Sequence, residues 1–232
     1  MKKYILPALA IFFLSCGGEE ETMNEDVNSE EVSVDTATVD SVIVDEPEEE
    51  LLEWGLEDYA QYSTRSMLYD SFDKEHLTDQ TAWVAEGTIE TQITYLTDPK
   101  NDWVIMFSWS TEDNESLEFV EAQYQPLYIE AYDNEVFTKA GLKTGMSLEE
   151  LVEWNNGEPV PFAGFGWDGS GGVFAGSESK IGKSKINIGL GMADAGWETH
   201  NALIGDIQLS SDEDRVQGAP ISVGSLTYYL TN

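Results

Sequence analysis

Apolar and polar residues alternate along several stretches of this chain. Between Ile89 and Tyr95 every second residue is apolar or β-branched, and Trp103 to Trp109 repeats the pattern. This period of two is typical of a strand with one buried face. Turn residues at 98–101 separate the two stretches, which predicts a hairpin. Further extended segments are predicted at 119–124, 127–132, 186–192, 203–209 and 221–230.

A helical period appears in the middle of the chain. Leu148, Leu151 and Val152 fall at positions i, i+3 and i+4, which gives a short helix one apolar face for docking. Ser147 and Glu150 have the spacing of a capping box, in which each side chain binds the backbone N–H of the other residue. The pattern therefore predicts a helix that begins after Ser147.

Turn residues end this helix and lead into a predicted strand. Gly157 accepts the left-handed conformation past the last turn, and Pro159 cannot continue a helix. The following segment, Val160–Trp167, is aromatic and contains two glycines. Glycine inside a strand indicates a backbone that a helix or a neighbouring strand approaches closely.

The remaining patterns indicate the fold class. Glu53 to Phe72 mixes apolar and polar residues in a way that predicts one or two more short helices. We therefore expect an α+β domain, mainly antiparallel β-sheet with two or three short helices. The sequence leaves open whether the parts on either side of position 126 share one core or form two.

Three runs in the centre of the chain resemble a family of uncharacterised Bacteroidetes secreted proteins and lipoproteins. They read GLKTGMSLEEL from Gly141, NNGEP from Asn155 and GFGWD from Gly164. The resemblance implies a secreted or lipid-anchored protein and no particular activity. The chain departs from the family's usual WDYGG, since it reads WDGSGG from Trp167. A weaker local resemblance connects the run GMSLEEL to small outer-membrane assembly lipoproteins of the SmpA/BamE kind.

The N-terminus has the pattern of a bacterial lipoprotein signal. Lys2 and Lys3 precede an apolar run from Tyr4 to Leu14, and the only cysteine of the chain, Cys16, follows. This predicts a signal peptide over residues 1–16, lipid on Cys16 and an outer-membrane location. An ordinary secretory signal with an incidental cysteine is the alternative. A single cysteine excludes an intramolecular disulfide.

An acidic stretch separates this signal from the rest of the chain. Glu19 to Glu50 contains fourteen acidic residues and no Lys or Arg. Such a composition predicts a disordered tether over residues 17–50, followed by a globular domain at 51–232. Glu19–Glu21 resembles the acidic export signals that send some Bacteroidetes lipoproteins to the cell surface. We therefore favour surface exposure, although an acidic tail also keeps a domain away from an anionic membrane.

Charge and motif spacing exclude several classes of function. The net charge is -34, and residues 51–232 contain 31 acidic and 9 basic residues, about -22, which disfavours nucleic acid as a partner. Residues 164–169 match G-x-G-x-x-G, but no helical pattern follows and Asp168 would repel phosphate. The only histidines, His76 and His200, lack metal-ligand spacing, so a zinc or Ser-His-Asp enzyme is poorly supported.

One pair of residues stands out as a candidate ligand contact. Trp167 offers a stacking surface, and Asp168 sits beside it at a glycine-rich turn, where it either tightens the turn or contacts a ligand or calcium. Residues 212–214 form an acidic loop without the EF-hand spacing. Trp103 and Trp109 fall on the core side of their strand. No catalytic pair, cofactor or metal site is predicted.

These observations predict a lipid-anchored envelope protein whose biochemical activity the sequence leaves open. Non-catalytic binding or scaffolding of an unknown protein or glycan is favoured over an enzyme. The alternative is a surface module that handles glycans or peptides, with hydrolysis or calcium dependence as options. A concave pocket with acids and an exposed tryptophan would favour this alternative, and a filled core beneath a flat sheet face would favour scaffolding.

Overall fold

The computed structural model describes residues 54–84, 88–125, 135–167 and 169–230. Contacts divide the chain into Met1–Pro47 and Glu48–Asn232, and every described residue belongs to the second unit. The predicted signal with Cys16, the acidic tether, the extended segment at 127–132 and Asp168 lie outside the described residues.

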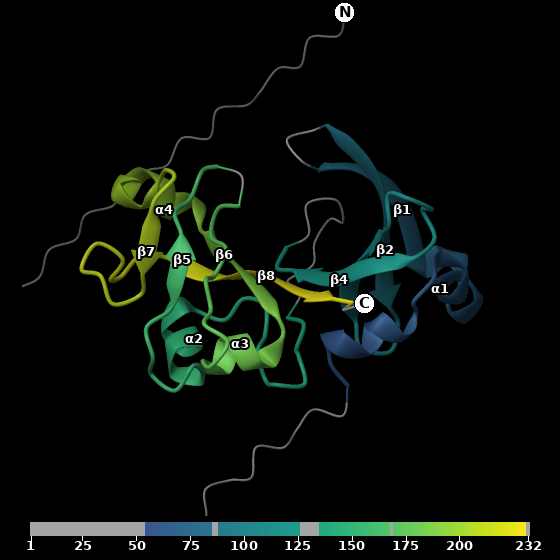
Figure 1. Ribbon diagram of the computed structural model, residues 1–232, viewed down its shortest axis with the longest axis horizontal. Coiled ribbons are helices and arrows are strands. Elements are labelled where there is room, and N and C mark those ends of the chain that lie inside the picture. The colour runs from purple at the N-terminus through teal and green to yellow at the C-terminus, as the bar shows by residue number, and fades with distance from the viewer. Residues whose placement is uncertain (1–53, 85–87, 126–134, 168, 231–232) are drawn as a thin grey trace, which may run out of the picture. The chain divides into compact units, whose positions relative to one another are not determined.

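A six-stranded antiparallel sheet forms the main framework, with the strand order β1-β2-β3-β4-β8-β6 (Figure 1). Its strands are β1 Leu77–Val84, β2 Ile89–Asp98, β3 Trp103–Trp109, β4 Leu117–Gln123, β6 Asn187–Met192 and β8 Ile221–Tyr229. A separate two-stranded ribbon pairs β5, Pro161–Ala163, with β7, Gln208–Ser210. Together with the short helices, this confirms the predicted α+β class with mainly antiparallel sheet.

Short helices connect and cover these strands. The α-helices of the described residues are α1 Arg65–Ser71, α2 Leu148–Trp154, α3 Lys180–Ser184 and α4 Asp194–Thr199, and the 3₁₀ helices are η1 Leu56–Gln61, η2 Lys74–His76 and η3 Asn201–Leu203. The capping box of α2 is confirmed. The N–H of Glu150 donates to Ser147 Oγ at 3.1 Å, and the N–H of Ser147 donates to Glu150 Oε2 at 2.7 Å.

Several predicted strands are confirmed, including the hairpin of β2 and β3, which pairs Asp98 with Trp103. β4, β6 and β8 overlap the segments predicted at 119–124, 186–192 and 221–230. β1 was not predicted, because its sequence LTDQTAWV does not alternate regularly. It pairs with β2 over its full length and forms one edge of the sheet.

Two predicted strands are shorter than expected, because glycines with positive φ interrupt the chain. The segment predicted at 203–209 begins at the end of η3, and its only strand, β7, starts at Gln208, after Gly205 with φ +122°. In the segment Val160–Trp167, β5 ends at Ala163, and Gly166, with φ +86°, prevents extended geometry at the far end of the segment. Positive φ is incompatible with extended strand geometry.

β8 links the edge strand β6 to β4. Its residues 221–223 pair with β6, its last residues 228–229 pair with β4, and residues 225–227 pair with both neighbours. Figure 1 shows the strand running from the β5 and β6 side toward β4. β8 therefore joins strands that are more than sixty residues apart in the chain, 117–123 and 187–192, in one sheet.

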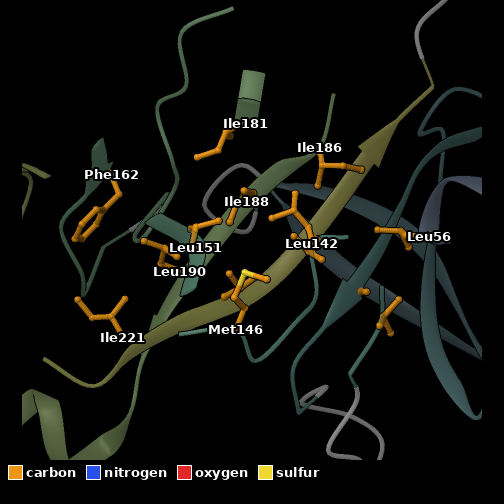
Figure 2. Close-up of a cluster of buried hydrophobic side chains, with 14 of the residues drawn as sticks. Leu56, Leu142, Met146, Leu151, Phe162, Ile181, Ile186, Ile188, Leu190 and Ile221 are labelled. Atoms are coloured by element: carbon orange, nitrogen blue, oxygen red, sulfur yellow. The ribbon is translucent and has the colours of Figure 1, made fainter. Parts of the chain in front are cut away.

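One large hydrophobic cluster draws on residues from both sides of position 126, among them Ile105, Leu151 and Leu226. Figure 2 shows side chains of α2, β5, β6 and β8 converging on this cluster. Trp109 is fully buried and Trp103 packs against the cluster, which confirms that they lie on the core side of β3. A smaller cluster uses the alternate residues of β2 and β3: Ile93, Tyr95, Val104 and Met106.

Candidate functional site

The glycine-rich segment after β5 holds the predicted contact residue Trp167 at the surface. Trp167 is 40% exposed, and its Nε1 donates to the carbonyl oxygen of Gly164 at 3.0 Å. Gly164 is buried against the segment after η3, since an added Cβ would lie 2.5 Å from the carbonyl oxygen of Gly205. The predicted close approach of another backbone is present, but the approaching segment, around Gly205, lies between η3 and β7 and is neither a helix nor a strand.

Backbone hydrogen bonds lock this segment in place. The N–H of Phe165 donates to Leu203 O at 2.9 Å, and the N–H of Gly205 donates to Phe165 O at 2.8 Å. Further along, an added Cβ at Gly171 would lie only 2.0 Å from the carbonyl oxygen of Leu190 on β6. The turn that carries Trp167 is thus held between the segment that follows η3 and the edge strand β6.

Two more apolar side chains join Trp167 at the surface. Trp197 of α4 is 38% exposed and packs edge-to-face on Phe165 at 6.4 Å between ring centroids. Ile204 is 39% exposed. A Cβ at Gly166 would lie 3.1 Å from Ile204 Cγ2 and 3.4 Å from Trp197 Cζ3, so both side chains adjoin the residue before Trp167. We call Trp167, Trp197 and Ile204 the tryptophan patch.

Sequence reasoning missed two of these three residues. Trp197 lies on a short helix, and Ile204 lies in an irregular part of the segment predicted as a strand at 203–209. No local period marks either residue as a partner of Trp167. An exposed cluster of large apolar side chains is a common mark of an interaction surface. The patch is therefore a candidate contact surface for a partner molecule.

A groove lies between α2 and the segment 211–217. Its volume is about 360 Å³. Its apolar lining residues are Leu148, Val152, Pro159 and Val216, and its acidic lining residues are Glu149, Glu153 and Asp212. No tryptophan lines the groove. The described lining of the groove is thus acidic and apolar, without the exposed tryptophan expected of a glycan- or peptide-processing cleft.

The acidic loop at 212–214 is held by contacts within the protein. Glu213 accepts a hydrogen bond from the N–H of Ser210 at 2.9 Å and forms an ion pair with Arg215 at 2.6 Å. Asp212 accepts a hydrogen bond from the hydroxyl of Ser210. Within the described ranges, no group of three or more His, Cys, Asp or Glu residues could hold a metal ion.

The two histidines are partly exposed. His76 lies in η2 with Glu75 at 3.9 Å, and His200 caps the end of α4 with its Nδ1 at 2.8 Å from the hydroxyl of Thr199. Both therefore occupy helix ends, as surface histidines commonly do.

The pKa shifts of the described carboxyl groups point to structural roles. Each of the four shifted groups, Asp79, Asp113, Glu115 and Glu150, has a lowered pKa. Hydrogen bonds from backbone N–H groups or serine hydroxyls are the main cause for the last three, and at Asp79 hydrogen bonds outweigh burial. A general acid needs the opposite shift.

Comparison with family models, with curated proteins and with solved structures finds no match to this chain. Among the described residues, none of the helices is both long and apolar enough to cross a membrane. The proposals that follow therefore depend on the geometry and the sequence alone.

Proposed function

We propose that this chain is a lipid-anchored protein of the bacterial outer membrane, and that its folded domain is a non-catalytic binding module. The basic, then apolar, leader that ends at Cys16 supports the lipid anchor. The acid-rich stretch that follows would hold the domain away from the membrane, with the cell surface favoured over the periplasmic face.

The tryptophan patch is the observation that carries the binding role. Burying a large aromatic side chain in a partner contributes much of the energy at many interfaces. Here two indoles and one isoleucine remain more than a third exposed while their backbone is locked by hydrogen bonds. A rigid apolar surface of this kind binds without the entropy loss of ordering a loop.

The lining of the groove and the direction of the carboxyl pKa shifts support binding over catalysis. A hydrolytic site would place a carboxyl group of raised pKa beside the bound substrate. No tryptophan is among the described residues that line the acidic groove, and the described carboxyl groups with a shifted pKa, such as Asp79 and Glu150, have lowered pKa values. The alternative, a surface module for glycans or peptides, retains the exposed indoles in its favour, since they stack on sugar rings as well as on protein.

Site-specific photo-cross-linking in intact cells tests the binding role. Benzoylphenylalanine replaces Trp197 or Ile204 in the full-length, lipid-anchored protein, and Trp83 serves as the matched control. Trp83 lies on β1, outside the patch, and is 60% exposed. We expect discrete adducts at the two patch positions and none at position 83.

The nature of the adducts separates the two candidate partners. Adducts that proteinase destroys indicate a protein, and adducts sensitive to periodate indicate a glycan. Equal cross-linking at positions 197 and 83 would mean that the patch is not a specific contact surface, and the proposal would fail.

The lipid anchor has its own test. In cells fed an alkyne fatty acid, the wild-type protein should carry the label and the Cys16→Ala variant should not. Protease added to intact cells should digest the wild-type domain. Protection until the outer membrane is opened would place the domain on the periplasmic face.

A further inference from the structure

The groove between α2 and the segment 211–217 has both apolar and acidic lining residues. Such a lining suits a side chain with an aliphatic stem and a positively charged end. Val216 is buried and Val152 half-buried, and both contribute to the apolar lining. Glu149, Glu153 and Asp212 are exposed and also line the groove. The cavity, about 360 Å³, accommodates one long side chain and part of its backbone.

Hydrogen bonds make both walls rigid. On the α2 side, Asn155 Nδ2 donates to the carbonyl oxygen of Glu158 at 3.1 Å and fixes the turn that leaves the helix. On the other side, Gln217 Nε2 donates to Ser211 O at 2.8 Å, and Ser211 Oγ accepts from the N–H of Val160 at 2.9 Å. The groove is therefore held open by structure that does not depend on an occupant.

The charges of the groove are uncompensated. Among the residues that the structure describes, Glu149, Glu153 and Asp212 form no ion pair. No basic residue is among the described residues that line the groove, and the neighbouring Arg215 is paired with Glu213. Glu149 and Glu153 are one helical turn apart, where like charges destabilise a helix. A cation placed between them would relieve this repulsion.

We propose that this groove binds an arginine side chain presented by a polypeptide partner. The guanidinium forms paired hydrogen bonds with carboxylates, and the aliphatic stem packs on apolar surface, here Val152 and Val216. The proposal rests on the binding role proposed above and adds the class of partner, a protein segment with arginine next to apolar residues. The strong negative charge of residues 51–232 attracts such a segment over long range.

Fluorescence anisotropy with the full mature chain tests the groove. The ligand is a labelled nine-residue peptide with two arginines flanked by leucines, and the comparison peptide carries citrulline, the neutral isostere, in place of each arginine. We expect the arginine peptide to bind at least about tenfold more tightly, because citrulline keeps the shape and loses the charge.

Matched double variants separate the groove from general electrostatic attraction. Glu149→Gln with Glu153→Gln removes two charges at the groove, and Glu112→Gln with Glu118→Gln removes two exposed charges elsewhere. Only the first pair should weaken binding of the arginine peptide by about tenfold or more. Equal weakening by both pairs, or equal affinity for the citrulline peptide, would overturn the proposal. Thermal melts confirm that each variant is folded.

The peptide-binding test of the groove can succeed or fail independently of the cross-linking test of the tryptophan patch. If the arginine peptide does not bind while cross-links at Trp197 persist in cells, the groove inference fails and the binding role stands. If the peptide binds and the cross-links are absent, the groove is a binding site and the patch is not.

Discussion

The buried hydroxyl of Tyr59 anchors η1 to the turn between β2 and β3. Tyr59 is fully buried, Asp98 is 4% exposed, and the Tyr59 hydroxyl donates to the carboxylate of Asp98. The same carboxylate accepts from Asn101 Nδ2 at 3.0 Å and from the N–H of Lys100 at 2.8 Å. Three donors therefore satisfy a carboxylate that is almost completely removed from water.

Tyr59→Phe removes one of these donors and leaves the ring in place. The edge-to-face contacts with Trp54, at 5.7 Å, and Phe107, at 6.3 Å, should persist. A hydrogen bond to a charged group contributes about 1.5 to 3 kcal/mol. We expect the free energy of unfolding to fall by about 2 kcal/mol, and the melting temperature by about 4 to 8 °C for a domain of this size.

The pH dependence gives an independent check. Burial, and then the hydrogen bond to Asp98, raises the pKa of Tyr59 above its ordinary value of 10.0. A tyrosine whose pKa is higher in the folded state stabilises the protein below the unfolded pKa, and this stabilisation is lost as the pH rises above it. The difference in the free energy of unfolding between wild type and Tyr59→Phe should therefore decrease as the pH rises above about 10.

Urea unfolding followed by circular dichroism at pH 7.5, 9 and 10.5 measures both effects. Tyr228→Phe is the control, because Tyr228 is half-buried and its hydroxyl makes no hydrogen bond within the described part of the chain. The reasoning is refuted if Tyr59→Phe lowers the free energy of unfolding by less than about 0.5 kcal/mol, the range of neutral surface substitutions, or by no more than Tyr228→Phe.

Three further substitutions test the glycine turn and the acid stability of the sheet edge. Gly171 and Gly218 have φ of +72° and +74°, but an added Cβ lies 2.0 Å from Leu190 O at Gly171 and meets nothing within 4 Å at Gly218. Gly218→Ala should lower the free energy of unfolding by about 1 kcal/mol, and Gly171→Ala should lower it several times more. Equal melting temperatures for the two variants would contradict this prediction. At Asp79, burial acts to raise the pKa, but hydrogen bonds from Tyr69, Thr94 and Arg65 lower it overall. A lowered carboxyl pKa stabilises the fold above the unfolded value of about 3.9 and ceases to do so as the pH falls. In thermal melts, the melting temperature of Asp79→Asn should therefore fall less than that of wild type between pH 6 and pH 2.5. Equal falls for the two proteins would contradict this prediction.

Local structure was predictable wherever the interactions that form it are close in sequence. The capping box of Ser147 and Glu150 requires only residues three positions apart, and the hairpin of β2 and β3 requires only alternation around a short turn. Trp109 could be assigned to the core because side chains on a strand alternate between its two faces. In each case a short stretch of chain contains the whole physical cause.

The tertiary structure decided which distant segments meet. β8 lies between β4 and β6, and the post-η3 segment brings Ile204 and Trp197 beside the turn at Gly166. The groove likewise needs α2 and residues 211–217 to face each other. These contacts depend on long-range strand pairing and on packing of a shared core, which no local period encodes. The chain's own pattern thus determined the β2–β3 hairpin and the cap of α2, while the candidate binding surfaces arose only from the assembled fold.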